Sequence, residues 1–158
     1  IDIGFARQLI DIDKHRLFEQ HIYTDNMVAL VPSQHLLASR KSLRLADLAQ
    51  EKIILFKRQD AVELYDQIVL SCKSSGFIPM ITAHSENMRN LITLVASGLG
   101  VSIVPEQIRY ICSAECVYIP ISDLSIILPL NMYFKKRADK KHVAQFCEVC
   151  IKEMCISE

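Results

Sequence analysis

Short apolar runs alternate along the chain with longer stretches in which apolar residues recur every three or four positions. The short runs are rich in Ile, Val, Leu and Phe, which is typical of buried β-strands. They predict strands with the sequences IDIGF (1–5), MVALV (27–31), KIILF (52–56), FIPMIT (77–82), VSIV (101–104), VYIPI (117–121) and LNMYF (130–134). Because Pro79 has no N–H to donate, it predicts that strand 77–82 lies at the edge of a sheet.

The stretches with helical spacing predict a helix over 61–75, a helix carrying Met88 to Leu99, a short helix opened by Pro105 and a final helix from about 138 to 155. One or two helical turns are expected within 42–50. Asp60, Ser85 and Ser42 are candidate N-caps, and Gly76 follows the end of the first helix. This alternation of strands and helices predicts an α/β protein built from βαβ units, with a parallel, doubly wound sheet.

The segment LVASGLGVSIVP (94–105) joins a helix to a strand within a few residues and contains two of the four glycines. Gly98 fits the left-handed position that ends a helix, which glycine adopts without steric cost. Gly100 either turns the chain again or lets another group approach the backbone closely. A tight-turn role is sufficient for Gly98 and is the simpler reading of Gly100.

The composition adds limits to this picture. A chain of 158 residues, 51% hydrophobic, has the size and composition of one globular domain. Its formal net charge is zero, so it shows no electrostatic footprint for nucleic acid or an anionic membrane. No apolar run reaches the length of about 18 residues that spans a bilayer. Since the chain starts with a strand-like segment and not with Met, we expect it to come from the middle of a longer protein.

The six cysteines are best explained as reduced structural thiols of a cytoplasmic protein. Cys147 and Cys150 fall on the apolar stripe of the last predicted helix, Cys112 and Cys116 form a Cys-x3-Cys pair, and Cys72 stands alone. The spacing does not match a typical zinc site. Metal binding and redox chemistry remain as alternatives for these residues.

Five segments in the same order resemble the effector-binding domain of LysR-type transcriptional regulators: DIGFAR (2–7), TDNMVALVPSQHLLA (24–38), SLRLADLAQEKIILF (42–56), SGFIP (75–79) and LVASGLGVSIVPE (94–106). Leu36 stands where the family usually has proline. The resemblance implies a two-lobe fold like that of type 2 periplasmic binding proteins, with the ligand in the cleft. It places residues 1–26 and 130–158 in the first lobe, which is incomplete, and residues 27–129 in the second. The N-terminal winged helix-turn-helix domain is then absent from this chain.

Arg7 is the first candidate contact for an effector, because it follows a strand and its guanidinium can hold a carboxylate with two hydrogen bonds. The resemblance implies the same role, while an ordinary surface or salt-bridge arginine is the equal alternative. Phe56, Lys57 and Arg58 lie between a strand and a helix N-terminus, which favours anions. A solvated charged turn is the alternative for Lys57 and Arg58. Gly100 and Ile103 are the remaining candidates, as parts of the cleft wall, with a role in the core as the favoured alternative for Ile103.

No catalytic motif stands out, and the five histidines are scattered without metal-ligand spacing. We therefore expect no cofactor and no metal, and a regulator that is not an enzyme. The resemblance implies a small organic carboxylate as effector, promoter DNA bound through the missing N-terminal domain, homodimers or homotetramers, and a cytoplasmic location without membrane contact. A solute-binding protein of a transport system, or an enzyme on a related two-lobe scaffold, are the alternatives.

Overall fold

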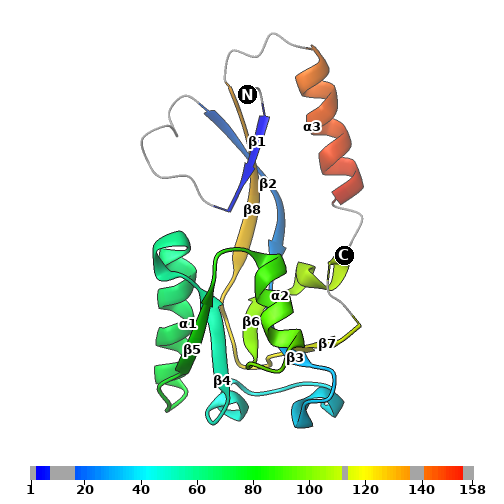
Figure 1. Ribbon diagram of the computed structural model, residues 1–158. Coiled ribbons are helices and arrows are strands. Elements are labelled where there is room, and N and C mark those ends of the chain that lie inside the picture. Colours follow the sequence, from blue (N-terminus) through cyan, green and yellow to red (C-terminus); the bar gives the residue numbers. More distant parts are fainter. Residues whose placement is uncertain (1–2, 8–16, 112–113, 136–140, 155–158) are drawn as a thin grey trace. The chain divides into compact units, whose positions relative to one another are not determined.

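The computed structural model describes residues 3–7, 17–111, 114–135 and 141–154. The chain divides into two compact units (Figure 1). Unit 1 comprises Ile1–Asp25 and Ile127–Glu158, and unit 2 comprises Asn26–Ile126. The chain therefore passes from one unit to the other twice, first after Asp25 and then after Ile126.

Unit 1 is built on three antiparallel strands, β1 (Ile3–Ala6), β2 (Leu17–Asp25) and β8 (Leu128–Lys135), in the order β1-β8-β2. Helix α3 (Lys141–Met154) packs against this sheet. The core between them contains Ile22 and Met132 of the strands and Val143 and Cys147 of the helix. The apolar stripe predicted for the last helix is thus confirmed at Val143 and Cys147.

Strand β2 contains a bulge at Ile22. His21 is paired with Asn131, but the next pair along the ladder is Tyr23 with Leu130, so Ile22 is one residue extra. Side chains of a regular strand alternate between the two faces of the sheet. The bulge therefore turns Tyr23 and Asp25 toward the face that Ile22 occupies, where a regular strand would have turned Thr24.

Unit 2 contains five strands: β3 (Met27–Pro32), β4 (Lys52–Phe56), β5 (Met80–Ser85), β6 (Ser102–Pro105) and β7 (Cys116–Pro120). β3 pairs in antiparallel fashion with both β6 and β7, and β4 pairs in parallel with β5. A parallel bridge between Ile53 and Val101 joins the two groups. Within the described residues β5 pairs only with β4, as expected for an edge strand.

Two helices complete unit 2, namely α1 (Val62–Ser74) and α2 (Met88–Ala96). α2 supplies Leu91, Ile92 and Val95 to a core that also contains side chains of β3, β4 and β6, and the half-buried Phe56 packs against this core. Short 3₁₀ turns occupy Leu36–Ser39, Leu45–Leu48, Arg58–Asp60 and Glu106–Tyr110. No helix in the described residues is long and apolar enough to cross a membrane.

Several expectations about the elements need correction. The prediction of a parallel, doubly wound sheet is wrong for most of the chain. Among the described strands, β4 and β5 form the only parallel pair, and the other pairs are antiparallel. Strand β2 was not predicted at all. The strand expected from Phe77 begins at Met80, after Pro79. The final helix is confirmed over Lys141–Met154, while its expected start near residue 138 lies outside the described residues.

The predicted caps are also wrong in detail. Helix α1 has Ala61 at its N-cap, and Asp60 instead ends a 3₁₀ turn. Helix α2 is capped by Asn87, whose side chain accepts from the Asn90 amide, while Ser85 belongs to β5. The turns expected behind Ser42 are a 3₁₀ turn with Arg44 at its N-cap. The short helix after β6 is a 3₁₀ turn that Pro105 precedes as its N-cap.

The two glycines near residue 100 have separate structural reasons. Gly98 has φ +79° just after helix α2, which confirms the left-handed conformation expected there. At Gly100 a Cβ atom would lie 2.4 Å from the Lys52 carbonyl oxygen at the start of β4. The close approach expected at Gly100 is therefore made by the backbone of a neighbouring strand.

Candidate functional site

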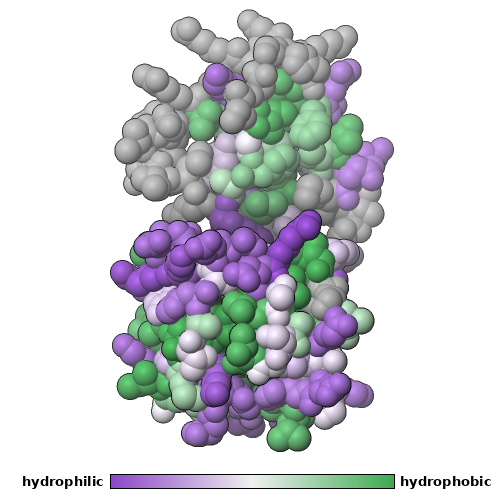
Figure 2. All heavy atoms as spheres, in the orientation of Figure 1, coloured by the Kyte–Doolittle hydropathy of each residue, from purple (hydrophilic) through white to green (hydrophobic). Residues whose placement is uncertain are grey.

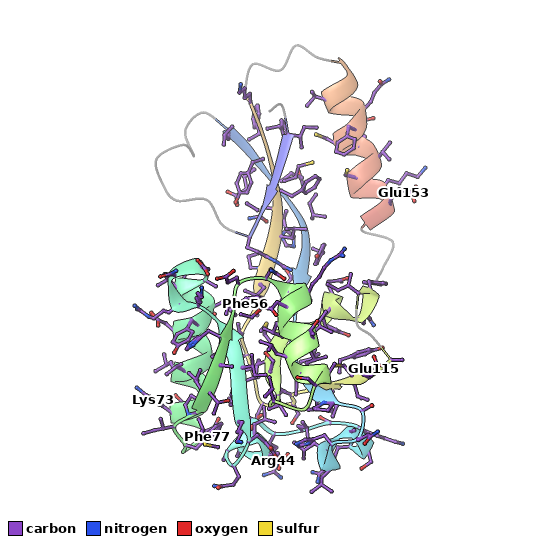
Figure 3. All side chains as sticks on the ribbon, in the orientation of Figure 1. Arg44, Phe56, Lys73, Phe77, Glu115 and Glu153 are labelled. Carbon is purple, nitrogen blue, oxygen red and sulfur yellow. The ribbon has the colours of Figure 1, made fainter. Side chains whose placement is uncertain are left out.

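The carboxyl end of β4 gathers most of the residues singled out in unit 2. β4 is buried from Ile53 to Leu55, and the chain then leaves the sheet through Phe56 and the turn Arg58–Asp60 to enter helix α1. In Figure 3 Phe56 lies at one end of unit 2, and Lys73 and Phe77 lie at the other. Figure 2 shows hydrophilic residues gathered at the end where Phe56 lies.

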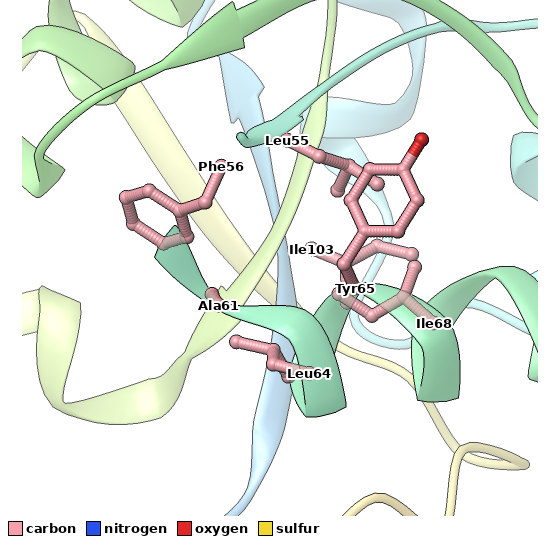
Figure 4. A pocket seen from close by; sticks show the side chains of 7 residues that line it. All are labelled: Leu55, Phe56, Ala61, Leu64, Tyr65, Ile68 and Ile103. Atoms are coloured by element: carbon pink, nitrogen blue, oxygen red, sulfur yellow. The ribbon is translucent and has the colours of Figure 1, made fainter. Parts of the chain in front are cut away.

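An apolar pocket lies behind this end of the strand (Figure 4). It is lined by residues of β4, of the first turns of α1 and of β6: Leu55, Phe56, Ala61, Leu64, Tyr65, Ile68 and Ile103. Its volume is only about 10 Å³. That is at the lower limit for a single water molecule, so the walls of this pocket are packed against each other. The structure thus brings Phe56 and Ile103 together in the lining of this apolar pocket.

A larger and more open hollow of about 430 Å³ lies beside it, lined by Lys57, Arg58, Gln59 and His84. The His84 ring stacks on Tyr65 at 6.2 Å between ring centroids. All four residues that line this hollow carry a polar or charged group, unlike most of those that line the apolar pocket. Lys57 and Arg58 therefore lie together, as predicted, with His84 as a neighbour that the sequence did not suggest.

Both cations of this hollow are paired with carboxylates. Lys57 Nζ donates to Glu86 Oε1 at 2.5 Å, and Arg58 donates to both oxygens of Asp66 at 2.7 and 2.6 Å. Hydrogen bonds from the two cations lower the pKa of Glu86 and of Asp66, and the same bonds raise the pKa of Lys57 and of Arg58. The positive charge expected here is thus offset by acidic side chains.

The N-terminus of helix α1 lies next to these residues. Ala61 occupies the N-cap and its side chain cannot accept a hydrogen bond from the first amides of the helix. The first amides of a helix lack partners within the helix and carry partial positive charge. The chemical features at this end of unit 2 are therefore amide donors, an apolar wall and two paired cations.

Gly100 is not part of this group. It contacts Lys52, the first residue of β4, whereas Phe56 is the last. Five residues of a strand cover on the order of 13 Å between the first and the last Cα. The placement supports a packing role for Gly100 and gives no support to a contact with an effector.

Arg7 belongs to unit 1 and lies just beyond the end of β1. Its guanidinium donates to Asp25 Oδ2 and to the Leu128 carbonyl oxygen, both at 3.0 Å, and lies 5.8 Å from the centre of the Tyr23 ring. The Arg7 side chain is 37% exposed, while that of Asp25 is 1% exposed. Arg7 therefore forms the salt bridge that the alternative interpretation expected. A part of its side chain still faces solvent.

Sequence reasoning did not single out Asp25 or Tyr65 as site residues. Asp25 belongs to a strand that was not predicted, and its approach to Arg7 depends on the bulge at Ile22. Tyr65 lies in the helix expected over 61–75, and only the fold brings it next to Ile103 and His84. No signal in the local sequence could have revealed the Arg7–Asp25 contact.

Of the cysteines in the described residues, Cys72, Cys147 and Cys150 are free thiols. Cys72 is fully buried in α1, and burial raises its pKa to about 11. Burial also raises the pKa of Cys147, and Cys116 Sγ donates to the Ile92 carbonyl oxygen at 3.8 Å. Cys112 and Cys155 lie outside the described residues. In the described part of the chain no group of three metal-ligating side chains comes together.

Comparison with known proteins gives consistent results. The family model for the LysR substrate binding domain matches residues 1–155. The HTH-type transcriptional regulator CatR of Pseudomonas putida is 29% identical over 147 residues, which cover 93% of this chain and 50% of CatR. The transcriptional dual regulator GltC of Bacillus subtilis (strain 168) is 33% identical over 86 residues, which cover 54% of this chain and 28% of GltC.

A solved structure of the BenM effector binding domain with its effector benzoate matches the fold with a TM-score of 0.77 at 23% identity. The match covers 97% of this chain and 68% of that chain. It confirms the expected α/β fold of the type 2 periplasmic binding protein class. The chain spans half the length of CatR and less than a third of the length of GltC. Because the family model covers almost the whole sequence, this chain belongs to the family of LysR substrate binding domains.

Proposed function

We propose that this chain senses a small organic carboxylate and thereby regulates transcription in a bacterial cytoplasm. Promoter DNA and further copies of the chain are its partners in this proposal, with DNA bound through another part of the protein. The relatives CatR and GltC are named as transcriptional regulators, which supports this role over that of a transport protein or an enzyme. Units 1 and 2 then correspond to the two lobes of the family.

The choice of a carboxylate rests on the hydrogen bonds and the solvent exposure of the Arg7 side chain. A guanidinium has five N–H groups, and the acceptors found for Arg7 in the described residues are Asp25 Oδ2 and the Leu128 carbonyl oxygen. More than a third of the side chain is exposed. A planar cation that is held on one side and open on the other suits a carboxylate, which accepts two parallel hydrogen bonds.

Unit 2, taken by itself, also has a feature that favours a carboxylate. The amides at the start of α1 favour an anionic or carbonyl oxygen, and Phe56 beside them offers apolar surface. Since the pocket behind Phe56 has room for about one water molecule, an aromatic or aliphatic acid would lie against Phe56 and not behind it. The BenM domain has benzoate as its effector, an acid of this type.

The experiment is a thermal-shift screen of the intact protein that carries this chain, against benzoate and small mono- and dicarboxylates. A ligand at about 100 times its dissociation constant adds about 2.7 kcal/mol to the free energy of unfolding, which raises the melting temperature by several degrees. Arg7→Lys keeps the charge and removes the planar fork, and Arg109→Lys is the matched control at an arginine paired with Glu106. A shift that is lost in Arg7→Lys and kept in Arg109→Lys supports the proposal. If no acid produces a shift, the carboxylate proposal is wrong.

A further inference from the structure

The chain passes twice between the units, and we call these two connections the passages. In unit 1 both passages start from the same end of the β2–β8 ladder. Asp25 is the last residue of unit 1 before the first passage, and Leu128 is the second residue after the return passage. The two residues are neighbours in the sheet, because Asp25 is paired with Leu128 at the end of the β2–β8 ladder. A side chain that holds both residues would therefore act on both passages.

Arg7 is in that position. Its guanidinium donates through one terminal nitrogen to Asp25 Oδ2 and through the other to the Leu128 carbonyl oxygen, at 3.0 Å each. The cation comes from a third segment, the end of β1, which pairs with β8 on the side away from β2. One side chain thus ties the end of β2 to the start of β8 from across the sheet.

The bulge at Ile22 makes this contact possible. Ile22 and Tyr23 both contribute to the core beneath α3, so the bulge places them on the same face of the sheet. Asp25 lies two residues after Tyr23, so both side chains face the same side of the sheet. The Arg7 guanidinium lies over the Tyr23 ring, and Tyr23 in turn packs against the core that includes Ile22 and Met132. Arg7 therefore rests on a packed support and reaches Asp25 from it.

Asp25 and Arg7 differ in solvent exposure and therefore have different roles in this contact. Asp25 is buried, and a buried carboxylate is stabilised when a cation donates to it. Arg7 is part-exposed and keeps a side open to solvent. The charged hydrogen bond that Arg7 donates to this buried acid orients the guanidinium, so that its open side is presented in a fixed direction.

We propose that Asp25 is a positioning residue that holds Arg7 as a tether across both chain passages, so that an anion bound by the open side of Arg7 restrains the two passages together. The second half of this statement rests on the carboxylate sensing proposed above. The first half does not. Anion binding at one guanidinium would then be felt at both segments through which the two units are covalently connected.

Hydrogen exchange of the backbone amides tests the tether in the intact protein without any acid. The variants are Arg7→Gln and the isosteric Asp25→Asn, and Arg109→Gln is the control at an arginine remote in sequence from both passages. We expect exchange to be about tenfold faster in the segments 24–28 and 126–130 in both test variants, which is the effect of losing one charged hydrogen bond. The amides of β4 report whether the variant is folded, and they should exchange as in the wild type.

The distribution of the change decides the outcome. Faster exchange in both segments, with β4 and the control unchanged, supports the tether. Faster exchange in only one of the segments, or in neither, overturns it, because a tether must act on both. If Arg7→Gln also exposes β4, the decision rests on Asp25→Asn, which preserves the shape of the buried residue.

A second measurement adds benzoate at a concentration that shifts the melting temperature of the wild type. We expect slower exchange in both segments of the wild type and no slowing in Asp25→Asn. If benzoate and the other acids give no thermal shift, the carboxylate proposal fails, while the acid-free exchange still decides the tether. If benzoate binds but slows exchange in neither segment, the transmission from Arg7 to the passages is wrong although the sensing proposal stands.

Discussion

The carbonyl oxygen of Lys52 lies 2.4 Å from the point where a Cβ atom on Gly100 would stand. The two backbones are held there by hydrogen bonds from the Val101 amide to Lys52 and from the Ile54 amide to Val101, each 2.8 Å long. These bonds join the parallel pair β4–β5 to the antiparallel strands of unit 2. A side chain at residue 100 would push apart the two backbones that connect the sheet.

Gly100→Ala is therefore expected to destabilise the protein. Neither backbone can move away without stretching the hydrogen bonds at Val101, so the cost should be that of overpacking, about 1–3 kcal/mol. Chemical denaturation at neutral pH measures it. Gly4→Ala is the matched control, because a Cβ atom at Gly4 would meet no atom within 4 Å. An unfolding midpoint for Gly100→Ala equal to that of the wild type would contradict the close approach.

Arg7→Ala is expected to lower the free energy of unfolding by about 2–3 kcal/mol. The variant removes the cation that donates to the buried Asp25, and breaking a buried ion pair costs about 3–5 kcal/mol when both partners are buried. We expect less here because Arg7 is part-exposed to solvent. Arg109→Ala, which loses a solvent-accessible pair with Glu106 and a surface contact with the Tyr110 ring, should change stability by less than about 0.5 kcal/mol. Equal losses in the two variants would argue against a special role of the Arg7–Asp25 pair.

These two cases mark what the sequence could and could not predict. The strand Lys52–Phe56 and the helix Val62–Ser74 follow from local apolar patterns, because each element is specified by its own buried face. The close approach at Gly100 was also among the expected roles of that residue. What approaches it was not, because Lys52 lies 48 residues earlier and the pairing of strands depends on the whole fold.

Strand β2 shows why other parts were missed. Its residues Glu19 and His21 are polar, but both are hydrogen-bonded to Asn131, whose Nδ2 donates to Glu19 Oε1 and whose Oδ1 lies 3.2 Å from His21 Nδ1. Partners more than 100 residues away explain these polar positions, and a local pattern cannot reveal them. The bulge at Ile22 then shifts the alternation of faces, so the approach of Asp25 to Arg7 required the structure as well.

The ion pair between Arg58 and Asp66 predicts a defined dependence of stability on pH. The hydrogen bond from Arg58 lowers the pKa of Asp66 below its ordinary value of 3.8, so the pair favours the folded state. A lowered carboxyl pKa adds stability that is fully present above the pKa of the unfolded state. That stability is lost as the pH falls through the still lower pKa of the folded state.

Asp66→Asn should therefore be less stable than the wild type at pH 7, with the difference shrinking as the pH falls below 3.8 and through the lower pKa of the folded state. Urea unfolding midpoints at several pH values measure this effect. The pair is exposed to solvent, so adding salt at about 0.5 M should shrink the difference in stability at pH 7. Glu148→Gln, at an exposed position of α3, serves as the control. A difference that does not shrink as the pH is lowered below 3.8 would mean that Asp66 acts through something other than its charge.

Cys72 is expected to be protected from thiol reagents as long as unit 2 is folded. It is fully buried, and its pKa of about 11 leaves only about 0.1% of the thiol ionised at pH 8. Alkylation by iodoacetamide at pH 8 is followed by mass spectrometry of the Cys72 peptide. The rate of labelling should be set by the unfolding of unit 2. The half-buried Cys150 should be labelled faster in the same sample. Rapid labelling of Cys72 under native conditions would show that helix α1 opens locally, and would remove the support for an inert structural thiol.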